Sequence, residues 1–128
     1  MIGLVVVSHS ARLAEGVCEL AGQMAQGKLR LAPAGGLADG ALGTDAFRVR
    51  EAIEAVYAED GVLILMDLGS AVLSAETALE LLDEGKRSRV RLCSAPLVEG
   101  AVAAAGLAAA GAGLEEILRE AHAAHSAK

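Results

Sequence analysis

Short apolar runs alternate with amphipathic stretches four times along the 128-residue chain, and this alternation limits the possible folds more than any other feature. The clearest runs are Ile2–Val7 and Gly61–Met66, which are almost continuously apolar, as in strands covered on both faces. Weaker runs at Leu29–Ala34 and Arg89–Ser94 are expected to supply two more strands. Repetition of strand and helix at these lengths predicts parallel strands with right-handed crossovers, and therefore an α/β fold with a three-layer, doubly wound parallel sheet.

Apolar residues between the strands recur at helical spacing, which predicts helices on both faces of the sheet. Gly27 is expected to end the first helix, and Thr44 or Asp45 to cap the second after a glycine-rich loop at 35–43. The expected inner faces are Leu13, Val17, Leu20 and Met24; Val49, Ile53 and Val56; Val72, Ala75, Leu79 and Leu82; and Leu114, Ile117, Leu118 and Ala121.

The expected strand order, 2-1-3-4, places two polar loops side by side. In doubly wound sheets, ligands and chemistry lie beyond the carboxyl ends of the strands, where the strand order reverses. Here the reversal falls between the first and third strands, which are followed by Ser8-His9-Ser10 and by Asp67-Leu68-Gly69-Ser70. The topology alone therefore predicts that His9 and Asp67 share one crevice.

A histidine beside a carboxylate is suited to nucleophilic catalysis. The carboxylate holds one ring N–H, which fixes the tautomer and leaves the lone pair of the other nitrogen free. An isolated loop histidine is more often a structural residue, but the position of His9 at the switch point favours a catalytic one. We predict that His9 accepts a phosphoryl group and that Asp67 orients its ring.

A phosphoryl group on His9 would need its negative charge stabilised, and the free N–H groups of helix N-termini provide this. Three helix starts are expected at the same edge of the sheet, and glycines there allow close approach of the backbone to an anion. Each start alone would be an ordinary cap, but three around a His–Asp pair favour phosphoryl stabilisation. The candidate phosphoryl-stabilising residues are Ser10, Gly43, Thr44, Gly69 and Ser70.

Two charged residues are further candidates for contact with the phosphoryl group or a partner. Arg12 lies one turn after His9, and Glu99 follows Pro96; for both, a solvated helix position is the alternative. His122 and His125 have no third ligand, so no metal is expected. Neither a Walker A motif nor a GxGxxG motif occurs, so no cofactor is expected on this chain.

Charge and cysteine usage restrict the class of protein. The formal net charge of −6, without a basic stripe, argues against nucleic acid as a partner. The N-terminus lacks a basic n-region, and the apolar runs are too short to cross a membrane. Cys18 and Cys93 form no CxxC pair and are expected to be two buried thiols in a reducing compartment. These features predict a cytoplasmic protein.

Several sequence blocks together resemble a known family. They are Gly3–Ser10, Gly43-Thr44-Asp45, the segment 66–78 and Ala95–Gly100. In this order they are similar to the phosphotransferase subunits of bacterial dihydroxyacetone kinases, whose N-terminal domain belongs to the mannose-type enzyme IIA family of the phosphoenolpyruvate:sugar phosphotransferase system. The resemblance covers nearly the whole chain and implies one such phosphocarrier domain over residues 1–128. It also implies that His9 is phosphorylated and that Asp67 hydrogen-bonds to it.

The resemblance further implies the partners. The phosphoryl donor would be the phosphocarrier protein HPr, and the acceptor would be ADP bound to the nucleotide-binding subunit of dihydroxyacetone kinase. Some relatives carry HPr-like and enzyme-I-like domains after this one; because this sequence stops at Lys128, a separate HPr is expected. Together with the alanine-rich surfaces, the resemblance also predicts a homodimer.

Three other functions were weighed. An enzyme IIA subunit of a mannose-type sugar transporter would use the same histidine chemistry, but the loop at 67–70 lacks the Trp-Gly-Gly type sequence of those subunits. A non-catalytic binding domain would make His9 incidental. A receiver-like domain, phosphorylated on Asp67, needs acidic residues after the first strand and a lysine after the last. The chain has Ser8-His9-Ser10 and Ala95-Pro96 there, so the receiver reading fails.

Overall fold

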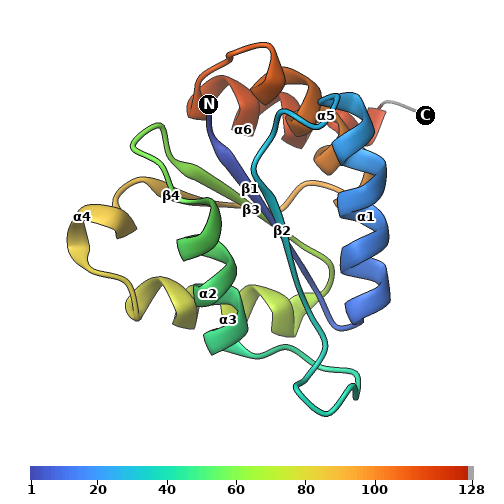
Figure 1. Ribbon diagram of the computed structural model, residues 1–128, viewed down its shortest axis with the longest axis vertical. Coiled ribbons are helices and arrows are strands. Elements are labelled where there is room, and N and C mark those ends of the chain that lie inside the picture. The colour runs from blue at the N-terminus through green and yellow to red at the C-terminus, as the bar shows by residue number, and fades with distance from the viewer. Residues whose placement is uncertain (127–128) are drawn as a thin grey trace.

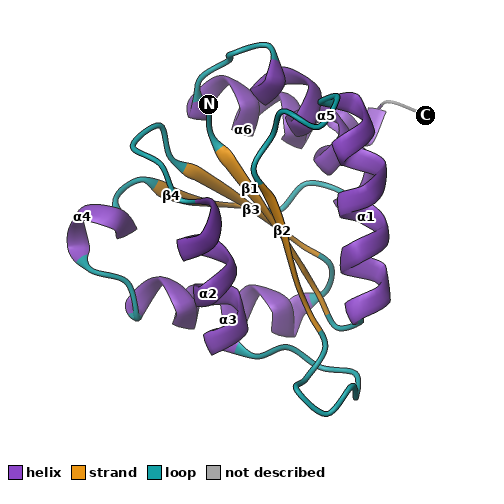
Figure 2. Cartoon of the chain, in the orientation of Figure 1, coloured by secondary structure: helices purple, strands orange, loops and turns teal. Residues whose placement is uncertain are grey.

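The chain folds around one parallel four-stranded sheet (Figures 1 and 2). The structure is a computed structural model that describes residues 1–126. The sheet order is β2-β1-β3-β4, so the predicted order and fold class are confirmed. The strands are β1 (Gly3–Ser8), β2 (Leu31–Gly35), β3 (Val62–Met66) and β4 (Val90–Cys93).

Helices cover both faces of the sheet, as predicted. A four-residue helix that the sequence analysis did not anticipate follows Asp83, whose side chain accepts a hydrogen bond from the backbone N–H of Lys86 at 3.0 Å. The helices are α1 (Ala11–Met24), α2 (Ala46–Val56), α3 (Gly69–Glu80), α4 (Glu84–Arg87), α5 (Leu97–Ala109) and α6 (Leu114–His122), and a 3-10 turn, η1, spans Ala123–Ser126.

Alternate residues of β1 enter two different cores because successive side chains of a strand point to opposite faces. Leu4 and Val6 pack under α1, α5 and α6, whereas Val5 and Val7 pack under α2 and α3. The helices of the first layer contribute mainly alanines, and α2 contributes larger valine and isoleucine side chains. Small side chains bring helix and sheet close together. A Cβ on Gly100 of α5 would lie 3.0 Å from a methyl carbon of Leu65.

The predicted inner face of α1 is partly wrong. Val17 is buried, but Leu13, Leu20 and Met24 are 44%, 49% and 54% exposed. The side chains that pack on the sheet are instead alanines at 14, 21 and 25. The reason is close packing: a Cβ on Gly35 of β2 would lie 2.6 Å from the carbonyl oxygen of Ser10, so there is little room for leucine at this face.

The other predicted helix faces agree better with the structure. Val49, Ile53 and Val56 of α2 are buried, as expected. In the α3 region, Ala75 and Leu82 are buried, while Val72 and Leu79 are partly buried against the same core. In α6, Ile117 and Ala121 are buried, and Leu114 and Leu118 pack at the edge of the core.

The carboxyl ends of β1 and β3 lie together at the lower edge of the sheet in Figure 1. The two strands are neighbours in parallel register, with Val7 opposite Met66. The backbone N–H of Asp67 continues the ladder by donating to the carbonyl of Val7 at 3.1 Å. The residues that follow these two strands are therefore held side by side by backbone pairing.

Candidate active site

His9 and Asp67 are in direct contact at this edge. The Nδ1 atom of His9 lies 2.9 Å from Oδ1 of Asp67, and the backbone N–H of His9 donates to Oδ2 at 2.9 Å. The side chain of Asp67 is 11% exposed and that of His9 is 26% exposed. One residue thus holds both oxygens of the carboxylate, while part of the imidazole ring remains open to solvent.

Two further donors complete the environment of Asp67. The hydroxyl of Ser8 donates to Oδ2 at 2.8 Å, and the backbone N–H of Leu68 donates to Oδ1 at 2.6 Å. Burial alone would raise the pKa of Asp67, but the hydrogen bonds from the His9 backbone, Ser8, the His9 ring and Leu68 outweigh it and lower the pKa below its ordinary value. Asp67 is therefore a carboxylate at neutral pH.

The tautomer of His9 follows from this contact. An ionised carboxylate can only accept, so Nδ1 must carry the proton that is shared with Asp67. In the neutral ring the lone pair then lies on Nε2, which is hydrogen-bonded to the hydroxyl of Ser70. Ser70 is therefore the donor in that bond. The nucleophilic nitrogen is Nε2, and it faces the start of α3.

The loop between β2 and α2 is fastened to both sides of this centre. The backbone N–H of Gly43 donates to the carbonyl of His9 at 2.8 Å. Thr44 donates from its hydroxyl to the carbonyl of Ser70 at 3.3 Å, and its hydroxyl lies 2.6 Å from that of Ser74. Gly43 has a φ of 147°, and a Cβ there would lie 3.0 Å from the side chain of Leu37. A glycine is therefore required at the point where the loop meets His9.

The expected helix starts play different parts. Ser10 caps α1 by accepting from the N–H of Leu13 at 3.2 Å, and its own N–H donates to the hydroxyl of Ser8 at 3.0 Å. Asp45, rather than Thr44, caps α2. The N–H groups of Ser10 and Gly43 are thus already engaged within the protein. The first N–H groups of α3, from Gly69 and Ser70, have no partner within the helix, and this helix start also carries the hydroxyl that contacts Nε2.

The two charged candidates lie in different places. Arg12 is exposed on the first turn of α1, three residues after His9. Glu99 lines a groove with Met24, Val102 and Glu120, and His9 does not line that groove. The role of Glu99 as a contact for the phosphoryl group or a partner stays a prediction.

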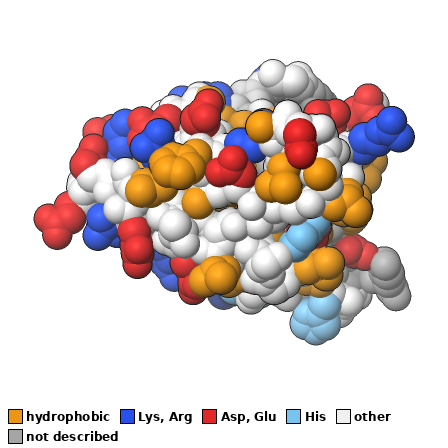
Figure 3. Space-filling view, turned by 90° about the horizontal axis from the view of Figure 1, so that it is seen from below, with side chains coloured by type: hydrophobic (Ala, Val, Ile, Leu, Met, Phe, Trp, Pro, Cys, Tyr) orange, Lys and Arg blue, Asp and Glu red, His pale blue; other side chains and the backbone are white. Residues whose placement is uncertain are grey.

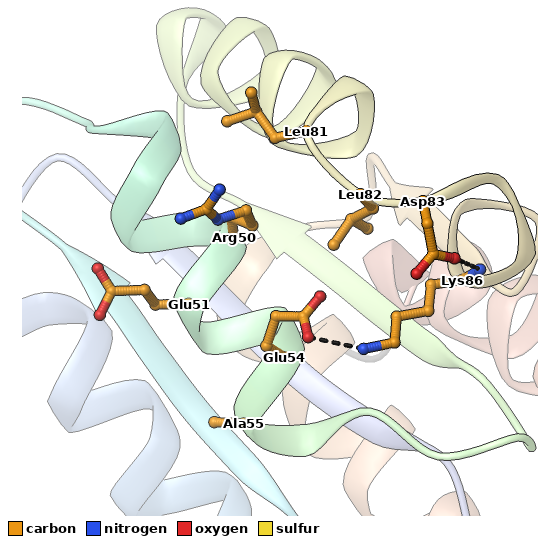
Figure 4. Close-up of a pocket in the computed structure, with 8 residues that line it drawn as sticks. All are labelled: Arg50, Glu51, Glu54, Ala55, Leu81, Leu82, Asp83 and Lys86. Carbon is orange, nitrogen blue, oxygen red and sulfur yellow. Dashed lines mark hydrogen bonds and ion pairs between the residues drawn. The ribbon is translucent and has the colours of Figure 1, made fainter.

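A more highly charged groove lies between α2 and the α3–α4 segment (Figure 4). Its volume is about 680 Å³. Lys86 pairs there with Glu54 at 2.7 Å and lies 5.2 Å from the centre of the Tyr57 ring. The groove is lined by Arg50, Glu51, Glu54, Ala55, Leu81, Leu82, Asp83 and Lys86.

Metal and membrane features can be stated for residues 1–126. Within this range, no group of three or more His, Cys, Asp or Glu side chains is placed to hold a metal ion. Cys18 and Cys93 are both free thiols. Across the same range, every helix is too short or too polar to span a bilayer.

The comparison with known families decides the class of this site. A family model described as the PTS system fructose IIA component, EIIA-man, matches residues 3–118. The chain belongs to this family. The resemblance to mannose-type enzyme IIA domains and to dihydroxyacetone kinase phosphotransferase subunits is therefore confirmed.

Curated relatives carry a consistent description. The chain is 55% identical to the phosphoryl donor subunit DhaM of PEP-dependent dihydroxyacetone kinase from Klebsiella michiganensis, over 100% of this chain and 28% of that relative. It is 53% identical to the DhaM subunit of Escherichia coli, with the same coverage. The DhaM subunit of dihydroxyacetone kinase 2 from Listeria innocua is 41% identical, and the match covers 94% of this chain and 96% of that protein. The chain thus spans little more than a quarter of some relatives and nearly all of another.

Solved structures support the fold. The crystal structure of the unknown-function protein EF1359 superposes with a TM-score of 0.85 at 39% identity, covering 96% of this chain and 95% of that one. A sigma-54 interaction domain protein from Enterococcus faecalis gives a TM-score of 0.71 at 18% identity, which supports the fold alone.

Two residues of the centre were missed by the sequence analysis. Ser8 is the one polar residue within residues 1–126 that is fully buried, and it stands in the alternation after Leu4 and Val6. One signal could have identified Ser8: it has a hydroxyl where the alternation calls for an aliphatic side chain, at a strand end beside the nucleophile. Ser74 follows Ser70 by four residues, which places both on one face of a helix.

Proposed function

We propose that this chain is a phosphocarrier that takes a phosphoryl group on Nε2 of His9 and passes it on in the PEP-dependent phosphorylation of dihydroxyacetone. The observation that carries the proposal is the His9–Asp67 pair, in which Nδ1 is held by the carboxylate at 2.9 Å and Nε2 faces outward. The names of the relatives, as phosphoryl donor subunits, support the same role.

The transfer step uses the lone pair of Nε2. This lone pair attacks the phosphorus of the incoming phosphoryl group, the Nε2–P bond forms, and the bond from phosphorus to the donor nitrogen breaks, with its electron pair returning to the donor. The ring becomes positively charged as the bond forms. Asp67, which accepts the Nδ1–H bond, stabilises that charge and keeps the ring aligned. In transfer to ADP, an oxygen of its terminal phosphate attacks the phosphorus, the Nε2–P bond breaks, and its electron pair returns to Nε2.

The start of α3 is suited to hold the phosphoryl oxygens. Phosphorylation adds roughly two negative charges. Ser70 must release Nε2 when the phosphoryl group arrives, and its hydroxyl can then donate to a phosphoryl oxygen. The N–H groups of Gly69 and Ser70 and the positive end of the α3 dipole add further stabilisation. Thr44, bonded to the Ser70 carbonyl, fixes this helix start.

The proposed donor is phospho-HPr, and the proposed acceptor is ADP on the nucleotide-binding subunit of dihydroxyacetone kinase, in the cytoplasm. Exposed side chains in two loops and on α3 are suited to a protein partner: Leu42, Leu68 and Leu73 are 77%, 66% and 65% exposed. Figure 3, which views the molecule from this edge, shows hydrophobic patches among charged residues, with histidine side chains beside some of them. No cofactor on this chain is needed for the proposed step.

A homodimer is part of the proposal. Leu20 and Met24 of α1 and Val98 of α5 are exposed, and Met24 and Val98 line one apolar groove. A second copy that covers this surface would leave the His9 centre accessible. Sedimentation equilibrium would report a monomer mass if this part is wrong.

The decisive experiment reconstitutes the transfer. The protein is incubated with phosphoenolpyruvate, enzyme I and HPr, and its mass is followed. We expect the gain of one phosphoryl group, which is lost again when the ADP-loaded kinase subunit is added. Absence of any gain contradicts the phosphocarrier role. A phosphoryl group that forms but is not discharged by the kinase subunit would instead favour an enzyme IIA subunit of a sugar transporter.

A further inference from the structure

Ser8 links the end of β1 to the carboxylate of Asp67. It is the last residue of the strand, and its side chain is fully buried. Its backbone is fixed by the sheet, since it pairs with Gly35 of β2 and its carbonyl accepts from the N–H of Gly36 at 3.2 Å. The position of the Ser8 hydroxyl is therefore largely fixed by the backbone of the sheet.

The direction of the Ser8 hydroxyl proton is determined by its two neighbours. The oxygen accepts from the backbone N–H of Ser10 at 3.0 Å and lies 2.8 Å from Oδ2 of Asp67. A hydroxyl has one proton to donate, and the carboxylate can only accept. The proton of Ser8 must therefore point to Asp67.

This bond completes the hydrogen bonding of the carboxylate. A carboxylate offers about four lone-pair sites, two on each oxygen. In Asp67, Oδ1 receives the ring of His9 and the N–H of Leu68, and Oδ2 receives the N–H of His9 and the hydroxyl of Ser8. Of these four donors, Ser8 is the one side chain besides the nucleophile itself. Without it, Oδ2 would keep a single partner, the backbone N–H of His9, and the carboxylate would be held less firmly.

Resting on the proposed function, we propose that Ser8 is a positioning residue for phosphoryl transfer: its hydroxyl fixes Asp67 in the ionised, planar alignment that holds Nδ1–H of His9 and aims Nε2 outward. Ser8 does not touch the phosphoryl group. It acts through Asp67, and its hydrogen bond is one of those that lower the pKa of Asp67.

The test compares Ser8→Ala with Ser8→Thr in the full chain. Two quantities are measured: the rate of phosphoryl incorporation from phospho-HPr, and the pKa of Asp67 from the ¹³C shift of its carboxyl carbon. We expect Ser8→Ala to raise the pKa of Asp67 and to slow incorporation on the order of 10-fold, by analogy with residues that orient metal ligands through a hydrogen bond. Ser8→Thr, which keeps a hydroxyl, should restore both.

Two further variants separate positioning from stability. Ser10→Ala removes the neighbouring hydroxyl, which caps α1 but does not contact Asp67; it should lower the unfolding temperature and leave the pKa of Asp67 unchanged. Ser8→Cys, which has similar size but a weaker donor, replaces Ser8→Ala should the alanine variant not fold.

The outcomes distinguish this inference from the proposed function. If the protein without substitutions is not phosphorylated, the proposed function is wrong and the inference is wrong with it. If that protein is phosphorylated but Ser8→Ala leaves both the transfer rate and the pKa of Asp67 unchanged, only the inference about Ser8 is overturned. A slower rate without a change in that pKa also contradicts it, because Ser8 would then act by another route.

Discussion

The His9 centre and the groove between α2 and α4 both contain ionisable side chains in hydrogen-bonded pairs, yet they are built differently. In the groove, the side chains of Lys86 and Glu54 are 33% and 42% exposed and form a direct ion pair at 2.7 Å that is open to solvent. In the His9 centre, Asp67 is 11% exposed and is satisfied by donors from its own strand end and the neighbouring one. The groove contains more charged side chains, and its one direct ion pair, between Lys86 and Glu54, is exposed.

The difference shows what makes a site reactive in this fold. Surface ion pairs on helices are screened by solvent and held by flexible side chains, so they contribute little to the free energy of unfolding. Asp67 and His9 instead follow adjacent strands whose backbones are hydrogen-bonded, so the carboxylate is aligned before any ligand arrives. Because Asp67 accepts the Nδ1–H bond, the reactive lone pair lies on Nε2, where it accepts from the hydroxyl of Ser70.

The largest effect is expected from His9→Gln, which removes the nucleophile while keeping the size and polarity of the side chain. Phosphoryl incorporation should be abolished, because the substitution removes Nε2, the ring nitrogen that carries the nucleophilic lone pair. In the protein without this substitution, the phosphoryl group should be lost in acid and stable in alkali, as for a phosphoramidate. Intact-protein mass spectrometry checks both; incorporation that survives the substitution contradicts the assignment.

Removing the carboxylate should be the next largest change. Asp67→Ala is expected to fold and to slow phosphoryl transfer by about 10²-fold or more, as orienting carboxylates do in catalytic triads. Glu54→Ala is the matched control from the groove, since it also removes a hydrogen-bonded carboxylate. Rapid-quench measurement of both variants should show a large loss for the first and none for the second. Equal rates for the two would remove the distinction between the sites.

The response to phosphorylation should also separate the two regions. The added charge at His9 should shift backbone amide resonances at residues 8–12, 43–45 and 69–72, which surround Nε2. Residues 83–86 of the groove and 114–121 of α6 should shift little. Two-dimensional NMR spectra recorded before and after phosphorylation test this. If the loops at 43–45 and 69–72 do not respond, the phosphoryl group points elsewhere, and Arg12 becomes the first candidate for charge compensation.

Asp67 should contribute to stability in a pH-dependent way. Its pKa in the folded protein lies below the ordinary value of about 3.9, so its contribution is present above that value and is lost as the pH falls through the lowered pKa. Asp67→Asn cannot titrate. Urea unfolding should therefore show a larger stability difference between the two proteins at pH 6 than at pH 3. A difference that is the same at both pH values would contradict the lowered pKa.

The smallest effect is expected in the groove. The hydrogen bond with Glu54 raises the pKa of Lys86, with smaller contributions from nearby negative charges. Glu54→Gln should bring that pKa back toward its ordinary value without changing the transfer rate. The ¹⁵N shift of the Lys86 side chain as a function of pH reports the first quantity, and the mass-spectrometric time course reports the second. A slower transfer in this variant would indicate that the groove takes part in partner binding.

The sequence predicted the sheet and the position of the His9 centre for a clear physical reason. The apolar runs that became β1 and β3 admit few alternatives, and the carboxyl ends of neighbouring parallel strands must meet. The contact between His9 and Asp67 is therefore a consequence of topology. The hydroxyl of Ser8 was not predicted, because its role depends on the orientation of one carboxylate within the crevice.

The error in the inner face of α1 has its origin in packing. Hydrophobicity alone favoured Leu13, Leu20 and Met24 as the buried face of α1, yet the close approach of helix and sheet selects alanines there. Glu99 was named as a candidate contact for the phosphoryl group or a partner, with a solvated helix position as the alternative. It lines a groove with Met24 and Val102, and its role stays a prediction.

The side chains of β1 alternate between two unequal cores, and this alternation fixes the register of the strand and therefore the position of His9. Leu4 and Val6 fit an alanine-lined layer, and Val5 and Val7 fit a bulkier one, so sliding the strand by one residue would put every side chain in the wrong layer. The same slip would carry His9 about 3.3 Å along the edge, beyond reach of Asp67. Insertions or deletions within β1 should thus be lost through misfolding and through misalignment alike, whereas the exposed bend around Asp39 and Gly40 can change length without moving the imidazole.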